Sequence, residues 1–394
     1  MKKTFVLVML LASLVACNNN SSSESSSAFN SDSSEAQASS SIFVPSITNL
    51  KAEPQGHFSE AQTNYLSSEN YSDTTPYNGN LSVSKPLPVH ISWECDAPGP
   101  YKVEISPVSA SSKLVYEVNE TSFDFYNPFL NTDYEVVVSK DNQTARATFN
   151  ETISVSGPRS LFVEGVENFR DIGGYGKFVN GEYKPYMKQG MIYRSGRFNE
   201  DKEDPVKVTI TENGINEINN HLKIKTEIDL RRTSNNEVGS LTNESVLGKN
   251  VNYIQIPMAF GGKNILTFEG KLSSDDYKYN NPEAIKQFFE LFADENNYPI
   301  NFHCSIGKDR TGCMAYLIEG LVGFDQEDAY RDYMFTNYAD AGMCKMSDIL
   351  DRYGPTIDEY ENGTSFQEKV YNYLHEVIGV STQNLDTIIN LLKA

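Results

Sequence analysis

The ten residues 303–312, HCSIGKDRTG, decide how the larger part of this chain folds. The apolar run before them, YPINF at residues 298–302, is typical of a short buried strand, and CMAYLIE at residues 313–319 begins a helical pattern. A loop between a strand and a helix turns successive backbone N–H groups toward one point, at the positive end of the helix dipole. The decamer therefore predicts an anion-binding loop at the end of a strand.

Cys304 is placed in that loop as a candidate nucleophile. The field of the helix and the nearby Lys308 and Arg310 favour a thiolate over a thiol. The planar fork of Arg310 can hold two phosphate oxygens, which a lysine could not do. A lone buried cysteine is more often a small hydrophobic residue. Here, however, Cys, Gly, Arg and Thr all stand at the required offsets, so we interpret Cys304 as catalytic.

Three other uses of this loop compete with that interpretation. Rhodanese-like sulfurtransferases also place a cysteine loop before a helix, but they do not require arginine and threonine at these offsets. A metal site fits poorly, because Cys304 and Cys313 are nine residues apart and the chain has no CxxC pair. A surface adhesin that only recognises phosphate need not keep Cys304, Arg310 and Thr311 intact. We therefore expect an enzyme without a metal or other cofactor.

The decamer resembles the signature of cysteine-dependent protein tyrosine phosphatases. Its form HCxxGKDRTG is similar to an atypical bacterial branch of tyrosine and dual-specificity phosphatases. Three upstream segments resemble the NFRDxGGY opening, the YRS strand end and the DLRxxxE segment of that branch: residues 167–175 (ENFRDIGGY), 193–196 (YRSG) and 227–232 (EIDLRR) with Glu237. Downstream, residues 332–337 (DYMFTN), 373–374 (YL) and 379–381 (GVS) also fit. The resemblance covers residues 158–394.

The resemblance implies a role for each residue of the loop. Cys304 would form a phosphocysteine intermediate, Arg310 would hold the equatorial phosphate oxygens, and Thr311 would hydrogen-bond the thiolate. His303 either orients the loop or is simply a packed residue at the strand end. The phosphate-binding residues would be Ser305, Ile306, Gly307, Lys308, Asp309 and Arg310, and the supporting residues His303, Arg170, Asp171 and Arg231.

The general acid stays open between two aspartates. A group must protonate the leaving oxygen and then activate water. Classical relatives carry this aspartate in a Trp-Pro-Asp loop, but the single tryptophan of this chain, Trp93, lies outside the phosphatase-like part. The candidates are Asp309, which we favour slightly, and Asp229, which could instead hold the loop through a salt bridge with Arg231.

The N-terminus has the order of a secretory signal. Two lysines precede an apolar run at residues 5–11, which LVAC at residues 14–17 closes. The run is too short to span a bilayer as a stable helix, so we predict a signal peptide at residues 1–16. The small residues before Cys17 resemble a bacterial lipobox, in which cleavage leaves a diacylated cysteine. The alternative is an ordinary signal peptide whose cleavage site adjoins a cysteine.

The composition agrees with export of a lipid-anchored protein. Residues 17–41 are almost all Ser, Asn, Ala, Glu and Asp, which cannot bury a core and predict a flexible tether. The chain carries 33 basic and 53 acidic residues, a net charge of −20, and loss of the two N-terminal lysines makes it −22. Such a surface repels nucleic acid. We expect a membrane partner through Cys17, and a phosphorylated protein or phosphoinositide as substrate.

Two folded units are expected after the tether. Residues 42–155 lack helical periodicity and predict an antiparallel β-sandwich, with strands at residues 89–93, 101–106, 121–125, 134–138 and 145–149. Trp93 on an early strand and LNTDYEV at residues 130–136 resemble a fibronectin type III or immunoglobulin-like module. Nothing in this unit has the pattern of a catalytic site.

Residues 156–394 alternate strand and helix patterns, which predicts a central, mainly parallel sheet flanked by helices. The expected strands are residues 191–194, 225–230, 252–256 and 299–303, and the expected helices are residues 211–222, 282–293, 311–322, 326–336, 365–377 and 382–392. Asn280 or Asn281 and Ser381 have the pattern of helix N-caps. The catalytic loop should lie at the carboxyl end of a strand.

The anchor is tested on the native mature protein. We expect mass spectrometry to find an acylated Cys17 at the N-terminus, with residues 1–16 removed, because the small residues before it favour that cleavage. The Cys17→Ala variant should not be processed in this way. An unmodified mature N-terminus at another residue would remove the lipoprotein hypothesis and leave the enzymatic one untouched.

Overall fold

The computed structural model describes residues 46–74, 76, 85–200, 208–232, 244–260, 264–273, 276–339 and 344–394. The predicted signal peptide, Cys17, the tether and Glu237 lie outside the described residues. Residues 44–394 form one compact unit. In the described part of the chain, no helix is both long and apolar enough to cross a bilayer.

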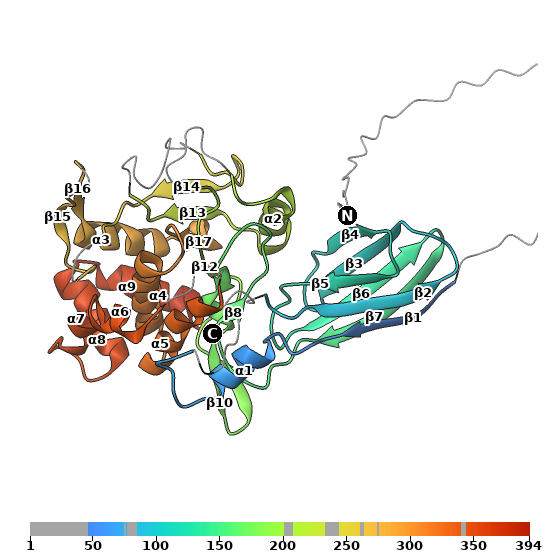
Figure 1. Cartoon of the computed structure of the whole chain (residues 1–394), viewed down its shortest axis with the longest axis horizontal. Helices are drawn as coiled ribbons and strands as arrows, with labels where there is room; N and C mark the ends of the chain where they lie inside the picture. Colours follow the sequence, from blue (N-terminus) through green and yellow to red (C-terminus); the bar gives the residue numbers. More distant parts are fainter. Residues whose placement is uncertain are drawn as a thin grey trace, which may run out of the picture. The chain divides into compact units, whose positions relative to one another are not determined.

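Two antiparallel sheets follow the tether region in the sequence (Figure 1). One sheet has the order β1 (Ile47–Glu53), β2 (Val89–Cys95) and β5 (Ser122–Phe125). The other has the order β4 (Leu114–Val118), β3 (Tyr101–Pro107), β6 (Asp133–Lys140) and β7 (Gln143–Asn150). Alternate residues of both sheets enter one hydrophobic core, in which Trp93 packs edge-on against Tyr101. The five strands predicted here are confirmed to within two residues at each end.

The expectation that residues 42–155 contain no helix is wrong. Helix α1 (Glu60–Leu66) has only seven residues, too few for a visible period, and a capping box between Ser59 and Gln62 begins it. Its buried Tyr65 and Leu66, together with Phe58, belong to the same hydrophobic cluster as helices of the C-terminal part. Residues of the predicted first unit therefore complete the core of the second.

The central sheet of the C-terminal part has six strands. Their order is β14 (Asn252–Gln255), β13 (Thr226–Asp229), β17 (Ile300–His303), β12 (Ile192–Ser195), β9 (Arg170–Asp171) and β8 (Arg159–Ser160). The labels β14, β13, β17, β12 and β8 follow one another from top to bottom in Figure 1. The first four strands run parallel, and β9 and β8 add an antiparallel edge. The predicted mainly parallel sheet is confirmed, and β17 lies inside it with every residue buried.

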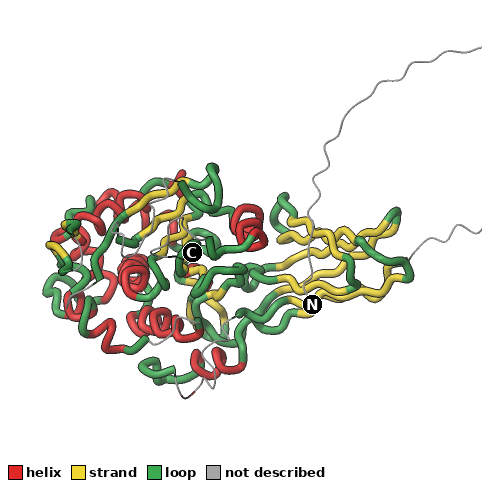
Figure 2. The backbone as a smooth tube through the Cα atoms, turned by 45° about the horizontal axis from the view of Figure 1, so that its top comes forward, coloured by secondary structure: helices red, strands yellow, loops and turns green. Residues whose placement is uncertain are grey.

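Helices surround this sheet, as the red and yellow segments of Figure 2 show. Helix α4 is buried along its length after Asp309, because α5, α8 and α9 all contact it. The longer helices are α3 (Asn281–Phe292), α4 (Asp309–Val322), α5 (Gln326–Phe335), α8 (Phe366–Asn372) and α9 (Thr382–Leu392). The predicted N-caps Asn280 and Ser381 each accept a backbone N–H of the helix that follows.

Two predicted helices are confirmed as composite elements. The helix predicted at residues 211–222 is α2 (Glu212–Asn216) continued by a π-helical turn at Glu217–Leu222, and the helix predicted at residues 365–377 is α8 continued by a π-helical turn at Tyr373–Val377. Shorter elements that the sequence did not predict are the hairpins β10 (Gly176–Val179) with β11 (Glu182–Pro185) and β15 (Glu269–Lys271) with β16 (Lys278–Asn280), α6 (Met346–Leu350) and α7 (Gly354–Asp358). The fold thus places the loop after β17 between a buried strand and a buried helix.

The contribution of the N-terminal residues to the catalytic core is tested by Phe58→Ala. The ring of Phe58 is 4 % exposed and lies edge-on to Phe335, with 6.3 Å between the ring centroids. Its removal should lower the free energy of unfolding by about 3–5 kcal/mol, measured by urea denaturation. Val108→Ala, at a 64 % exposed position, should change it by less than about 0.5 kcal/mol. Equal effects of the two substitutions would contradict a shared core.

Candidate active site

The catalytic loop begins where β17 ends. Cys304 follows His303 directly, is 2 % exposed, and is separated by four residues from Asp309, the first residue of α4. Parallel neighbours β13 and β12 flank β17, so the carboxyl ends of three strands meet at the loop. The structure therefore places the predicted nucleophile at the edge where parallel sheets present their ligands.

Three consecutive carbonyl groups of the loop are held from one side by side-chain donors. The carbonyl oxygen of Ser305 accepts both the backbone N–H and Nη1 of Arg197, each at 3.1 Å. Asn168 Nδ2 lies 3.1 Å from the carbonyl oxygens of both Ile306 and Gly307. Arg194 Nη2 donates to the Gly307 oxygen at 2.9 Å. We call Asn168, Arg194 and Arg197 the loop brace.

The loop brace determines where the amide groups point. In a trans peptide the C=O and the following N–H point in opposite directions. Because the carbonyls of residues 305–307 face the brace, the N–H groups of residues 306–308 face away from it. A row of such donors at the start of a helix is an anion-binding arrangement. This geometry is what the decamer predicted for a phosphate site.

Gly307 allows the loop to approach the brace. Its φ of +72° lies in the left-handed region, which residues with a Cβ rarely adopt. A Cβ at this position would also lie 2.5 Å from the carbonyl oxygen of Ser195 and 2.8 Å from Asn168 Nδ2. Glycine is therefore required here both by the backbone and by the close contact.

Asp332 of helix α5 supports the brace through ion pairs with Arg170 and Arg194. Its Oδ1 lies 2.7 Å from Arg170 Nε, and its Oδ2 contacts Arg194 Nη1. Arg170 in turn contacts Oδ1 of Asn168, so the aspartate reaches the loop through two routes. All four side chains are at least partly buried, and both ion pairs are almost fully so. Burial raises the pKa of Asp332, but the charges of Arg170 and Arg194 lower it by more. The net pKa of Asp332 is therefore below its usual value.

Arg310 and Thr311 occupy the first turn of α4. Arg310 is 3 % exposed, and its Nη1 lies 3.3 Å from the carbonyl oxygen of Leu230. The guanidinium carbon stands 4.7 Å from the centre of the Phe260 ring, a cation–π contact that orients the fork. Thr311 is fully buried, and its hydroxyl has no hydrogen-bond partner among the described residues. That hydroxyl is available to a thiolate.

Asp229 is held in a different arrangement. Its carboxylate accepts Nε and Nη2 of Arg231, at 3.0 and 2.8 Å, and the hydroxyl of Tyr253 at 2.9 Å. Burial by itself raises the pKa of Asp229, but the charges of Arg231 and His303 lower it more, so the carboxyl is ionised. Arg231 also donates to the backbone oxygen of Asn199 at 3.2 Å. The pair thus joins the end of β13 to the segment after β12.

His303 contacts the backbone of the nucleophile. Its Nδ1 lies 3.1 Å from the carbonyl oxygen of Cys304 and its Nε2 lies 3.0 Å from Oε1 of Glu227. Burial lowers the pKa of His303, but Asp229 and Glu227 raise it more, and the net pKa is above the usual value. A protonated ring donates from both nitrogens, which fits these two acceptors. The position of His303 is thus compatible with both hypotheses, that it orients the loop and that it is a packed residue at the strand end.

Asp171 is turned away from the loop. Its Oδ2 lies 2.7 Å from Arg159 Nη2, and Arg159 Nη1 donates to the carbonyl oxygens of Asn127 and Pro128. Asp171 thereby ties the segment after β5 to β9, and its carboxylate accepts hydrogen bonds from Arg159 and from the backbone N–H groups of Gly173 and Gly190. Its neighbour Arg170 reaches the loop through Asn168 instead.

Sequence reasoning did not assign a role to four residues that hold the loop: Asn168, Arg194, Arg197 and Asp332. Three of them lie inside segments that were recognised as family motifs, NFRDxGGY, YRS and DYMFTN. The signal was therefore present in those motifs, but only the folded chain shows that they converge on one loop.

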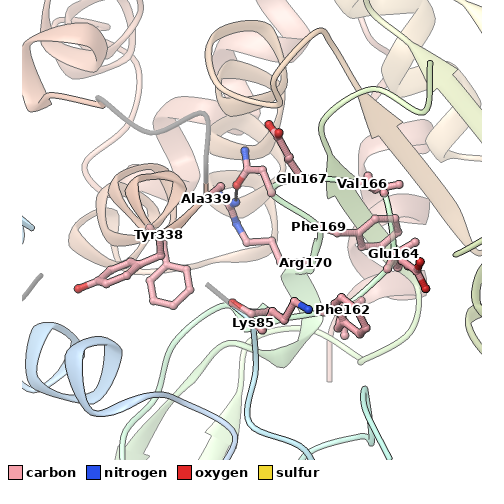
Figure 3. Close-up of a pocket in the computed structure, with 15 residues that line it drawn as sticks. Lys85, Phe162, Glu164, Val166, Glu167, Phe169, Arg170, Tyr338 and Ala339 are labelled. Atoms are coloured by element: carbon pink, nitrogen blue, oxygen red, sulfur yellow. Dashed lines mark hydrogen bonds between the residues drawn. The ribbon is translucent and has the colours of Figure 1, made fainter. Parts of the chain in front are cut away.

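A cavity of about 640 Å³ is lined in part by Asn168 of the brace and by Arg170. Figure 3 shows Lys85 beside the ring of Phe162 at one end and Arg170 near Ala339 at the other. No residue of the decamer lines this cavity, so we do not place the phosphate there. The described residues contain no cluster of three His, Cys, Asp or Glu side chains that could hold a metal ion.

Comparison with known families assigns the chain to a class. The sequence model of the Tyrosine phosphatase family matches residues 161–394, more than half of the chain. The protein therefore belongs to the tyrosine phosphatase family, and a cysteine-dependent phosphatase is the function that both the family and the loop support. Neither the sulfurtransferase nor the adhesin alternative is favoured.

Curated relatives agree with this class. A protein assigned as a tyrosine-protein phosphatase in Cupriavidus necator is 23 % identical over 202 residues, which are 48 % of this chain and 67 % of that relative. A protein assigned as tyrosine-protein phosphatase OCA1 in Meyerozyma guilliermondii is 26 % identical over 106 residues, 25 % of this chain and 57 % of its own length. A tyrosine-protein phosphatase of Nostoc commune is 35 % identical over 63 residues, 16 % of this chain and 21 % of that protein.

Solved structures show only a distant likeness. The core catalytic domain of the PP-IP phosphatase SIW14 from S. cerevisiae is 15 % identical and covers 44 % of this chain and 88 % of its own, with a TM-score of 0.28. TpbA of P. aeruginosa, solved with phosphotyrosine, is 14 % identical and covers 50 % of this chain and 86 % of its own, also with a TM-score of 0.28. Such scores do not support inferences about substrates.

The loop brace is tested by Asn168→Asp. Aspartate tolerates the positive φ of 56° and keeps an acceptor for Arg170, but it replaces the donor to two loop carbonyls with a negative oxygen. Binding of vanadate or phosphate should weaken roughly tenfold or more, measured by inhibition or calorimetry. Asn372→Asp is the matched control, because Asn372 is also partly buried and donates its amide to one backbone carbonyl. Unchanged vanadate binding in Asn168→Asp would contradict the role of the brace.

Proposed function

We propose that this protein hydrolyses phosphomonoesters through a phosphocysteine intermediate, with phosphotyrosine as its main substrate. The observation that carries the proposal is the loop after β17, in which Cys304 is followed by three amides turned to one side and then by Arg310 and Thr311. The phosphotyrosine preference rests on membership of the tyrosine phosphatase family and on the assigned activity of the relatives.

The proposed reaction has two displacements at phosphorus. In the first, Sγ of Cys304 attacks phosphorus, the bond to the ester oxygen breaks, and that oxygen takes a proton from a general acid. In the second, a water attacks phosphorus, the S–P bond breaks, and the same carboxylate takes the proton from the water. Arg310 and the loop amides bind the charged equatorial oxygens, and the buried Thr311 hydroxyl stabilises the departing thiolate.

Asp309 is the general acid of this proposal. A general acid must reach solvent and substrate, and the Asp309 side chain is 18 % exposed at the start of α4. Asp229 fits the role less well, because it is fully buried and its carboxylate is bound by Arg231 and Tyr253. Both oxygens of Asp229 accept hydrogen bonds in this arrangement, so neither is left to carry a proton to the substrate. We therefore infer that Asp229 supports the site through Arg231.

The proposal extends to other phosphate esters, because several cations surround the loop of an acidic chain. Arg232 stands 5.3 Å from the Phe260 ring that also contacts Arg310, and Lys308 belongs to the loop itself. This field favours substrates with additional negative charge, so phosphoinositides are included. Phosphoserine and phosphothreonine peptides are included because they carry the same phosphomonoester group as phosphotyrosine. Values of kcat/KM across phosphotyrosine peptides, phosphoserine or phosphothreonine peptides and phosphoinositides decide between them, and the highest value identifies the substrate class.

We also propose where the enzyme is located and what its N-terminal sheets do. An acylated Cys17 would hold the enzyme on the outer side of the bacterial cell membrane, with residues 17–41 as a tether. The two antiparallel sheets would form a fibronectin type III or immunoglobulin-like module that binds a partner or a surface-bound substrate. The pairing order of the sheets and the buried Trp93 support this assignment.

The nucleophile is tested by Cys304→Ser. Turnover of an aryl phosphate should fall to the background rate, because an alcohol at this position is not ionised as a thiolate is. Vanadate or phosphate binding should stay within about threefold of the wild-type value, since the loop amides and Arg310 remain. Substantial residual kcat would refute the mechanism. A chelator should leave wild-type activity unchanged, and activity that needs added zinc or magnesium would refute the metal-free proposal.

A further inference from the structure

Two charged residues of the loop are bound by a segment that sequence reasoning did not connect to the site. Lys308 Nζ lies 2.9 Å from Oδ2 of Asp348, which is in helix α6. Asp309 is paired with Nη1 of Arg352, which follows α6. Arg352 Nη2 lies 3.8 Å from Oδ1 of Asp348 and closes the set. These four side chains, the loop-mouth quartet, alternate in charge and link residues that are up to 44 positions apart in sequence.

The position of Arg352 is determined by the fold. Its backbone N–H donates to Ile349 of α6, and its carbonyl oxygen accepts the N–H of Ile265 at 3.0 Å. Its side chain is 28 % exposed, so the guanidinium is at the surface while the backbone beneath it is anchored. An arginine held at its base and directed at a loop carboxylate can orient that carboxylate with little cost in conformational entropy.

We propose that Arg352 is a positioning residue that orients the Asp309 carboxyl toward the leaving oxygen. This inference rests on the proposed function, in which Asp309 is the general acid. Arg352 contacts Oδ1 of Asp309, and a carboxylic acid can accept an arginine N–H at one oxygen while its other oxygen carries the proton. Oδ2 then donates that proton to the ester oxygen in the first displacement and takes a proton from water in the second.

Asp348 completes this arrangement from the opposite side. It accepts Lys308 and also the backbone N–H of Lys345, so it caps α6 and holds Lys308 at the same time. Asp348 thus contacts both cations of the quartet, Lys308 and Arg352. Because Asp348 also caps a helix, its substitution mixes two effects, and Arg352 is the better residue to test.

A purely structural ion pair has a different signature. Exposed ion pairs contribute only about 0–1 kcal/mol to stability, and their loss does not depend on which substrate the enzyme meets. A group that orients the general acid matters most for a poor leaving group, which needs a proton, and least for one that leaves as a stable anion. The dependence on the leaving group therefore separates the two roles.

The experiment compares kcat/KM for phenyl phosphate and p-nitrophenyl phosphate in the full-length protein. This constant reports the steps up to departure of the leaving group. In the Asp309→Asn variant, kcat/KM should fall roughly a hundredfold or more with phenyl phosphate and much less with p-nitrophenyl phosphate. In the Arg352→Met variant, kcat/KM should fall about tenfold with phenyl phosphate and less than about twofold with p-nitrophenyl phosphate. Arg352→Lys, which keeps the charge, should recover most of that loss.

Controls keep the outcomes distinct. Arg146→Met removes an arginine from an exposed pair with Glu135 in the N-terminal sheets and should change neither constant. Thermal unfolding should show the Arg352 variants folded, because their side chain is partly exposed. The positioning role alone would be overturned if Asp309→Asn lost kcat/KM selectively with phenyl phosphate, while Arg352→Met lost none or lost it equally with both substrates. Absence of selectivity in Asp309→Asn would overturn the general-acid assignment and the inference that rests on it.

Discussion

The pairing of Asp332 with Arg170 and Arg194 is the interaction on which the catalytic loop depends. An arginine taken out of water costs several kcal/mol unless a carboxylate and further acceptors meet it. Here one aspartate on α5 meets both arginines, Arg194 Nη2 also donates to the loop, and Arg170 Nη1 donates to Asn168. The loop is thus built on a buried charge cluster, and its carbonyls are turned toward that side because Asn168 and Arg194 offer them donors.

The same cluster explains how an acidic protein can bind a phosphate. Glu319 lies against Asp332, and burial, together with the charge of Asp332, raises the pKa of Glu319 well above its usual value. A neutral Glu319 leaves two arginines and a single aspartate beneath the loop, a net positive charge. That charge lies close to the anion site and acts there even though the chain as a whole has a net charge of −20.

The N-terminal part belongs to the enzyme structurally. Phe58, Tyr65 and Leu66 enter the hydrophobic core of the phosphatase, and Arg159 joins the segment after β5 to Asp171. The residue next to Asp171 is Arg170, which supports the loop brace. Packing and hydrogen bonds therefore connect the sheets to the base of the active site without contributing a residue to the loop itself.

The sequence by itself determined the chemistry and most of the long elements. The order of Cys304, Arg310 and Thr311 between a strand and a helix specifies an anion loop, because the direction of neighbouring amides is a local property of the chain. Strong periodicity also located β13, β17 and the long helices, whereas α1 and α6 were too short to leave a period.

Only the tertiary structure decided which groups hold the loop and which arginine pairs with each candidate acid. Arg197 meets Ser305 across 108 residues, Arg170 meets Asp332 across 162, and Arg352 meets Asp309 across 43. Local patterns cannot encode contacts over such separations. The physical reason is that a buried charge requires a partner wherever the folded chain brings one, so packing rather than sequence distance selects the pairs.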